Sequence, residues 1–172
     1  IADSAPVMMW VTRLDRTRDF VNDSYAEFAG MSREEARVMD WRAKIHPEDA
    51  ERLVLESVAG EASLQPFTLE ARYRRHDGEW RWLRSVSQPR FGADGALSGF
   101  IGVAMDITEQ RANEMALRES EARFKRIADS APVPMWVTRL DGSRDFVNRW
   151  FNDFFGFEEE GRGFHDWAGA IH

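Results

Sequence analysis

Few side chains in this sequence have the type and spacing that catalysis or metal binding requires. The four histidines include no pair four residues apart on a predicted helix, the spacing that helical metal sites use. The carboxylate pairs Glu34-Glu35 and Glu48-Asp49 fall in the first turns of predicted helices, where they complement the helix dipole. There is no cysteine, which excludes disulfides, thiol nucleophiles and cofactors attached through sulfur. We therefore expect no metal site and no enzyme activity in this segment.

The residues that best suit a mechanism are Asp106, Ile107 and Thr108, which join the last predicted strand to a long predicted helix. An Asp here accepts N–H groups of the helix start, or pairs with an arginine of the sheet. The candidate arginines are Arg72, Arg74 and Arg81. A shift of the sheet would then change the angle or register of the helix, the bistable element that a switch requires. A plain helix cap is equally compatible with these residues, and the two roles can coexist.

Alternating and turn-bounded apolar segments predict five strands, and helical spacing predicts short helices between the second and third. The predicted strands are residues 7–12, 19–22, 67–74, 80–90 and 97–105. The predicted helices begin near Asn22, at the capping box Ser32-Arg33-Glu34-Glu35, and at His46-Pro47; Gly30 ends the first and Gly60 the last. This order predicts an α+β domain, a five-stranded antiparallel sheet with short helices on one face, followed by a long linker helix.

Residues 108–126 contain no Gly or Pro and carry oppositely charged pairs four residues apart. These pairs are Glu114/Arg118, Glu119/Arg123 and Glu121/Lys125. Leu117 and Phe124 lie seven residues apart, which predicts one long amphipathic helix. Whether it also forms a two-stranded coiled coil stays open, because the apolar stripe covers too few heptads.

The chain contains a direct internal repeat, in which residues 1–22 match residues 127–148 almost without change. The match continues without a gap, so that Ile45-His46 corresponds to Ile171-His172. The spacing is that of whole domains, far longer than a solenoid unit. We predict a complete domain over residues 1–107, a linker helix over 108–126, and the truncated first part of a second domain over 127–172.

The net charge of −7 argues against nucleic-acid binding, which requires a basic face. No apolar run approaches the length of about 20 residues that spans a membrane. We expect a cytoplasmic segment without membrane or nucleic-acid partners.

Several motifs resemble one known family. Residues 72–83 resemble the paired strands in the C-terminal half of PAS domains, and residues 102–109 resemble the signature that closes such domains. Residues 45–49 resemble the segment before the family's long helix, and residues 19–22 the end of its second strand. The resemblance implies a sensory or relay module, typically of a bacterial histidine kinase, cyclic-di-nucleotide enzyme or chemoreceptor, whose output domain lies outside this chain.

The resemblance also bears on cofactors. Haem-binding members take an axial His from the long helix, and here that helix has none. Light-sensing flavin members form an adduct through a Cys, which is absent. We therefore expect no haem and no Cys-linked flavin, and the identity of any small-molecule ligand stays open.

In this family, ligands lie between the sheet and the helices. The residues expected to line such a pocket are Phe28, Met31, Val38, Trp41, Leu53, Val54, Leu69, Trp82, Val86, Gly102 and Ala104. Gly102 and Ala104 would leave room for a ligand. The alternative is that these side chains only fill the core that a domain of this size needs.

The truncated second repeat lacks the strands that should cover its core. We predict that it is poorly ordered, or that it buries its aromatic side chains against another surface, in a homodimer formed with the linker helix. These aromatic side chains are Trp136, Phe146, Phe151, Phe154 and Trp167. The sequence thus leaves two hypotheses: a non-catalytic relay that passes a conformational change through the linker helix, or a dimerising interaction scaffold without a ligand.

Overall fold

The computed structural model of the chain describes residues 7–156. The chain divides into two compact units, Ile1–Arg111 and Ala112–His172, and each has its own sheet. Among the helices of the described residues, none has both the length and the apolarity that crossing a bilayer requires.

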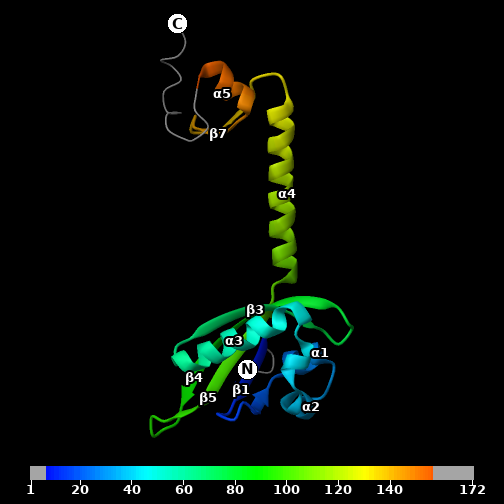
Figure 1. Cartoon of the computed structure of the whole chain (residues 1–172), viewed down its shortest axis with the longest axis vertical. Coiled ribbons are helices and arrows are strands. Elements are labelled where there is room, and N and C mark those ends of the chain that lie inside the picture. Colours follow the sequence, from blue (N-terminus) through cyan, green and yellow to red (C-terminus); the bar gives the residue numbers. More distant parts are fainter. Residues whose placement is uncertain (1–6, 157–172) are drawn as a thin grey trace. The chain divides into compact units, whose positions relative to one another are not determined.

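The first unit is built on a five-stranded antiparallel sheet, as the sequence predicts (Figure 1). Its strands are β1 (Met8–Thr12), β2 (Arg18–Val21), β3 (Phe67–Arg74), β4 (Trp80–Phe91) and β5 (Leu97–Asp106). They lie in the order β2-β1-β5-β4-β3, so the last strand of the unit is its centre. The strand that continues into the linker is therefore bonded on both sides.

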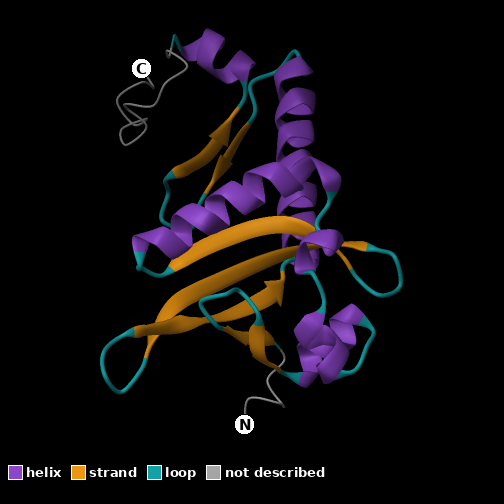
Figure 2. Ribbon diagram, turned by 60° about the horizontal axis from the view of Figure 1, so that its bottom comes forward, coloured by secondary structure: helices purple, strands orange, loops and turns teal. Residues whose placement is uncertain are grey.

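The helices between β2 and β3 cover one face of this sheet, and Figure 2 shows the longest of them lying across the strands. They are α1 (Asp23–Ala29), α2 (Arg33–Val38), the short 3-10 helix η2 (Trp41–Lys44) and α3 (Pro47–Ser63). The capping box of Ser32 and Glu35 is present, and Gly30 ends α1 in the left-handed conformation, as predicted. His46 caps α3 by accepting the N–H of Glu48, which confirms its helix-entry role.

The predicted end of α3 at Gly60 is wrong, because the helix continues to Ser63. Gly60 serves packing instead. A Cβ at this position would lie 2.4 Å from Cγ of Phe67, so the missing side chain makes room for that ring on β3. Glycine in a helix interior costs about 1 kcal/mol relative to alanine, and here the close approach of helix and strand compensates.

The linker helix α4 (Thr108–Ser130) begins at the predicted residue and runs four residues past its predicted end at Arg126. Residues 112–127 are all exposed. Ala128, near the end of the helix, is 1% exposed, because the second unit packs there.

The second unit repeats the start of the first in detail. Its elements are β6 (Trp136–Thr138), β7 (Arg144–Val147) and α5 (Arg149–Phe155). Trp10 pairs with Val21 and Trp136 pairs with Val147, and both hairpins shift register at the same place. The same sequence has therefore folded twice into the same local structure.

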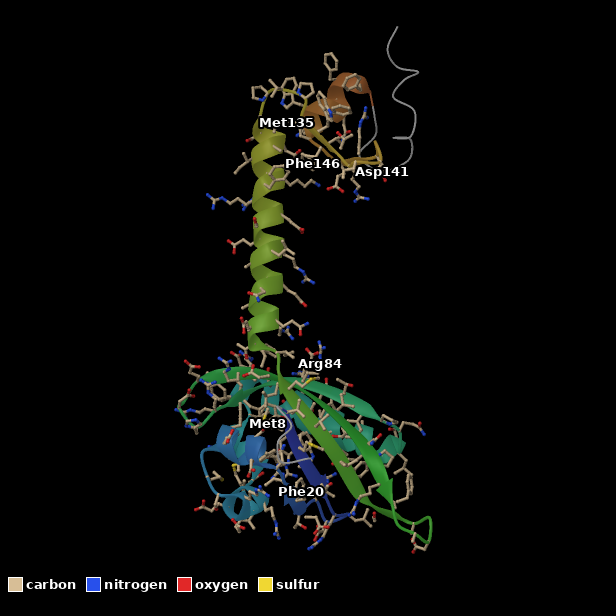
Figure 3. All side chains as sticks on the ribbon, turned by 180° about the vertical axis from the view of Figure 1, so that it is seen from behind. Met8, Phe20, Arg84, Met135, Asp141 and Phe146 are labelled. Atoms are coloured by element: carbon tan, nitrogen blue, oxygen red, sulfur yellow. The ribbon has the colours of Figure 1, made fainter. Side chains whose placement is uncertain are left out.

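We expected the second repeat to be poorly ordered, or to bury its aromatic residues against another surface; for Phe146 and Phe151 that surface lies within the chain. Phe146 packs on Phe124 of α4, with ring centroids 5.0 Å apart (Figure 3). Phe151 is 2% exposed, beneath Trp136 and Phe155. The linker helix itself thus supplies a covering surface. Trp136 and Phe154 stay exposed, and Trp167 lies outside the described residues.

The turn from β2 into α1 is held by Asn22, whose side chain is fully buried. Its Oδ1 accepts the N–H groups of Met9 at 2.9 Å and Tyr25 at 3.1 Å, and its Nδ2 donates to the carbonyl of Val7 at 2.8 Å. Asn148 makes the matching bonds to Met135, Phe151 and Val133. One amide thus satisfies at least three backbone groups in each unit.

Replacing Asn22 by alanine should lower the free energy of unfolding of the first unit by about 2–3 kcal/mol, because buried backbone groups lose their partners. Ser32→Ala is the matched control. It removes an exposed cap and should cost only about 1 kcal/mol. Urea unfolding followed by tryptophan fluorescence measures both. Equal effects of the two variants would contradict a buried structural role for Asn22.

Candidate functional site

A cavity of about 140 Å³ lies between the helices and the sheet of the first unit. Five of the residues predicted to line a pocket do line it: Phe28, Trp41, Val54, Leu69 and Ala104. They come from α1, η2, α3, β3 and β5. The space between helices and sheet is therefore not completely filled by side chains.

The prediction is wrong for Trp82 and Val86, which face away from the cavity. Strand β4 instead turns Leu83, Ser85 and Ser87 inward. Successive side chains of a strand point to opposite faces, so a register error of one residue exchanges the two sets. Ser85 and Ser87 make the inward face of β4 polar in the sequence, so the alternation of apolar residues does not identify it as the cavity face.

Four other predicted residues also lie outside the cavity lining. Val38 is 84% exposed, and Met31 packs on the small cluster around Val21. Leu53 is fully buried against Ile45 and Ala71, within the core.

Gly102 is the fourth of these residues. A Cβ there would lie 2.3 Å from Cζ2 of Trp10, so the missing side chain accommodates an indole ring and leaves no room for a ligand.

The polar residues of the cavity wall were missed from sequence. Arg18 on β2 is only 9% exposed, and its guanidinium lies 5.1 Å from the ring centre of Tyr25. Tyr73 lies close enough for its pKa to be affected by Tyr25 and Arg18. Burial raises the pKa of both tyrosines, so their phenols are neutral hydrogen-bonding groups near pH 7. The internal repeat could have pointed to Arg18, because this arginine recurs as Arg144 in the second copy.

The predicted joint, Asp106-Ile107-Thr108, is bonded to strand β4 at each of its three residues. Asp106 accepts a hydrogen bond from Nε of Arg81 at 2.7 Å. The N–H of Ile107 donates to the carbonyl of Trp82 at 2.8 Å, and the N–H of Trp82 donates to Oγ1 of Thr108, also at 2.8 Å. The backbone N–H and the backbone carbonyl of Trp82 are thus both hydrogen-bonded to the joint.

Asp106 acts both as a cap and as an ion-pair partner. Its Oδ1 accepts the N–H of Thr108 at 2.9 Å, while its Oδ2 binds Arg81. Burial works to raise the pKa of Asp106, but the hydrogen bonds from Thr108 and Arg81 outweigh it and hold this pKa below its usual value. The carboxylate therefore stays ionised at neutral pH.

The other two arginines proposed as partners of Asp106 lie elsewhere. Arg72 forms a two-pronged pair with Asp49 at the start of α3, with Nε–Oδ2 and Nη2–Oδ1 distances of 2.9 Å. It also binds Glu48. Arg74 is exposed at the edge of the cavity. Asp49 thus has a specific partner on the sheet in addition to its position in a helix first turn.

Arg111, in the first turn of α4, makes contacts with the sheet that sequence reasoning did not identify. Its guanidinium lies 4.0 Å from the ring centre of Trp82, and its Nη1 binds Glu70 of β3 at 2.8 Å. Glu70 also pairs with Arg84 of β4, which Figure 3 labels close to the start of the helix. The outward direction of Trp82 makes this contact possible.

Two family models match the chain, one described as "PAS fold" over residues 18–104 and one described as "PAS domain" over residues 122–171. The chain belongs to the PAS domain family. The first match contains the cavity residues of β2 to β5, and the second contains the end of α4 and the repeated hairpin.

Relatives of this PAS chain are found among signalling proteins. It is 34% identical over 146 residues to "Uncharacterized protein y4lL" of Sinorhizobium fredii, which covers 85% of this chain and 18% of the relative. It is 28% identical over 181 residues to "Two-component sensor PprA" of Pseudomonas aeruginosa, which covers 99% and 19%. The chain spans about a fifth of the length of these relatives. It is a sensory signal-transduction module.

A solved structure supports the same assignment. The PAS domain of a protein from Colwellia psychrerythraea is 25% identical, with a TM-score of 0.56, and the match covers 63% of this chain and 92% of that one. The five-stranded sheet with its covering helices is therefore a PAS core.

The second PAS unit is bonded to the end of α4. Nδ2 of Asn148 donates to the carbonyl of Ala128 at 2.7 Å, and the N–H of Arg149 donates to Oδ1 of Asp129 at 2.8 Å. Asn148 is fully buried, so its bond to the carbonyl of Ala128 is shielded from water. The helix thus has specific partners at both of its ends.

The Asp49–Arg72 pair should make the stability of the first PAS unit sensitive to acid. Hydrogen bonds from Arg72 lower the pKa of Asp49 to about 2 from an ordinary value of 3.8. A lowered pKa adds stability that is present above about pH 4 and is lost as the pH falls through about 2. Asp49→Asn should therefore cost about 2 kcal/mol at neutral pH and flatten the acid limb of the stability curve.

Glu48→Gln is the matched control for this prediction, because Glu48 also pairs with Arg72 but is 73% exposed. Exposed pairs contribute about 0–1 kcal/mol. Guanidinium unfolding at a series of pH values measures both variants. An unchanged acid limb in Asp49→Asn would contradict the prediction.

Proposed function

We propose that this segment is a non-catalytic relay, in which a change in the core of the first PAS unit passes through α4 to the second PAS unit. An output domain elsewhere in the full-length protein would receive the signal. A bacterial two-component sensor is the parent that the relatives favour. We also propose that the first PAS unit holds neither haem nor a Cys-linked flavin.

The observation that carries this proposal is the position of Trp82. Its N–H and carbonyl bond the joint, and its ring contacts Arg111 of α4. The next residue, Leu83, is 6% exposed and lines the cavity. Because close-packed interiors transmit displacements, a shift of Leu83 moves the peptide that holds the helix.

The contacts at the joint suit a two-state element. Asp106–Arg81, Arg111–Glu70 and Glu70–Arg84 are half-exposed ion pairs, each worth only about 0–1 kcal/mol. Pairs of this strength can exchange partners at low cost, while the buried Ile107 keeps the chain in place. A small change in the core can therefore shift the helix between arrangements.

The relay can be tested with two leucines that are equally buried but differently placed. Leu83→Ala should accelerate hydrogen exchange of the amides in residues 108–115, because it loosens the strand that holds the joint. Leu53→Ala is the matched control, since Leu53 is fully buried but lies on α3, against Ile45 and Ala71, and not on the strand that bonds the joint.

Exchange is compared by mass spectrometry at denaturant concentrations that give the two variants equal stability. The relay predicts faster exchange in residues 108–115 for Leu83→Ala alone. Equal exchange in the two variants would show that the joint reports only global stability, and would reject the relay.

A second candidate function is a dimerising scaffold, and the surface of α4 favours it. Met115, Leu117, Phe124 and Ile127 are between 48% and 68% exposed. Leu117 and Phe124 lie on one stripe, which a second copy of the helix would cover in a coiled coil. The exposed aromatic residues of the second unit, Trp136 and Phe154, would add to such a homodimer interface.

If α4 forms a homodimer, Leu117→Gln should weaken it by about tenfold or more, because a buried leucine contributes about 1.5–3 kcal/mol. Arg118→Gln, on the next residue and turned about 100° around the helix, should leave dimerisation unchanged. Sedimentation equilibrium gives both dissociation constants. A monomer at all concentrations would exclude the scaffold and leave the relay unaffected.

A further inference from the structure

The cavity of the first PAS unit contains a buried positive charge whose hydrogen-bonding capacity is not used up. Arg18 is 9% exposed and lines the cavity. Its Nη1 donates to the carbonyl of Met39 at 2.9 Å, but among residues 7–156 its buried Nε has no acceptor. No carboxylate of these described residues forms an ion pair with it. A buried cation without a counter-ion is costly, which points to an anion that completes the site.

The rest of the cavity wall has the same sign of charge. Apart from Arg18, the cationic side chains of the lining are Arg13, Arg16, Arg42, Lys44 and Arg74, against the single carboxylate of Glu61. Arg13, Arg16, Arg42 and Arg74 are exposed. Three of them have carboxylate partners: Arg13 pairs with Asp19, Arg16 with Glu61, and Arg42 more loosely with Asp40 at 3.9 Å. This excess stands out in a chain of net charge −7. Cations around a low-dielectric opening concentrate anions at it.

The other residues of the lining indicate the chemistry of the rest of the ligand. Trp10, Tyr25, Phe28, Trp41, Tyr73 and Phe100 supply aromatic surface. The volume of about 140 Å³ suits one ring, since an apolar cavity of about 150 Å³ holds benzene. The phenols of Tyr25 and Tyr73 offer hydrogen bonds near Arg18, and Ser87 adds a hydroxyl elsewhere in the lining.

We propose that this cavity binds a small aromatic carboxylate, with the carboxylate on the guanidinium of Arg18 and the ring among the aromatic side chains. Arginine suits this role because its planar fork matches the two oxygens of a carboxylate. The inference names a chemical class of signal for the relay proposed above, and its importance for signalling rests on that proposal. Binding itself does not depend on the relay.

The second PAS unit provides a matched control within the same chain. Arg144 occupies the place of Arg18, and its guanidinium lies 4.7 Å from the ring centre of Phe151, which stands in the place of Tyr25. The two arginines thus share a local structure, while only Arg18 lines the cavity of the first unit. Replacing each one separates loss of a local structural contact from loss of the site.

The test is isothermal titration calorimetry of the full chain with benzoate, 4-hydroxybenzoate and indole-3-acetate, and with the neutral benzamide. We expect at least one of the three carboxylates to bind, and benzamide to bind at least about tenfold more weakly than benzoate, because it cannot form the charge-assisted bond. Failure of all three carboxylates to bind overturns the proposal. Equal binding of benzamide and benzoate also overturns it.

Three variants locate the site for the carboxylate that binds. Arg18→Met should weaken binding by about 10- to 100-fold, the loss expected for a hydrogen bond to a charged group. Arg144→Met should leave it unchanged, and an equal loss in both variants overturns the assignment. Val54→Phe fills the cavity without changing charge and should abolish binding, so it decides the question if Arg18→Met does not fold.

Hydrogen exchange on the same samples tests the relay. Carboxylate binding that leaves hydrogen exchange in residues 108–115 unchanged would reject the relay and keep the anion site. Absence of carboxylate binding, together with the predicted effect of Leu83→Ala on exchange, would reject the anion site and keep the relay. The two proposals therefore fail in different measurements.

Discussion

The backbone N–H and carbonyl of Trp82 are the groups on which the attachment of α4 to the sheet depends. Its carbonyl accepts the N–H of Ile107, and its N–H donates to the hydroxyl of Thr108. Strand β5 ends here, so β4 continues to bond the chain for two residues beyond the last sheet pair, Leu83 with Asp106. The first turn of α4 therefore starts from a fixed place on the sheet.

The ion pairs around this place do different work from the backbone bonds. Backbone bonds near the buried Ile107 set the position of the helix start. The partly exposed pairs of Asp106 with Arg81 and of Arg111 with Glu70 add side-chain links between the start of the helix and the sheet. In the proposed relay, these weak pairs exchange partners while the backbone bonds stay in place.

Much of the fold could be predicted from sequence, because it depends on local signals. The strand alternation, the capping box at Ser32 and the glycine at position 30 each specify structure within a few residues. The faces of β4 could not be predicted, because Ser85 and Ser87 face inward and Trp82 faces outward. Arg111 was missed for the same reason, since its partner on the sheet had been assigned to the wrong face.

The cavity was predicted in position but not in chemistry. Apolar residues such as Phe28 and Leu69 follow from helical and strand spacing. A buried arginine does not, because its type predicts exposure. Arg18 lies on the edge strand β2 and lines a cavity whose walls come from elements far apart in the chain, and local sequence does not specify such contacts.

The buried asparagine of each unit has a consequence for how such chains grow. In the second unit, Asn148 donates to the carbonyl of Ala128, near the end of α4. The Asp-Ile-Thr segment of the first unit begins the same helix. The two units thus use different contacts on this helix, the Asp-Ile-Thr segment of the first at its start and Asn148 of the second at its end. Such an array has a fixed polarity and can lengthen by duplication without a new connector.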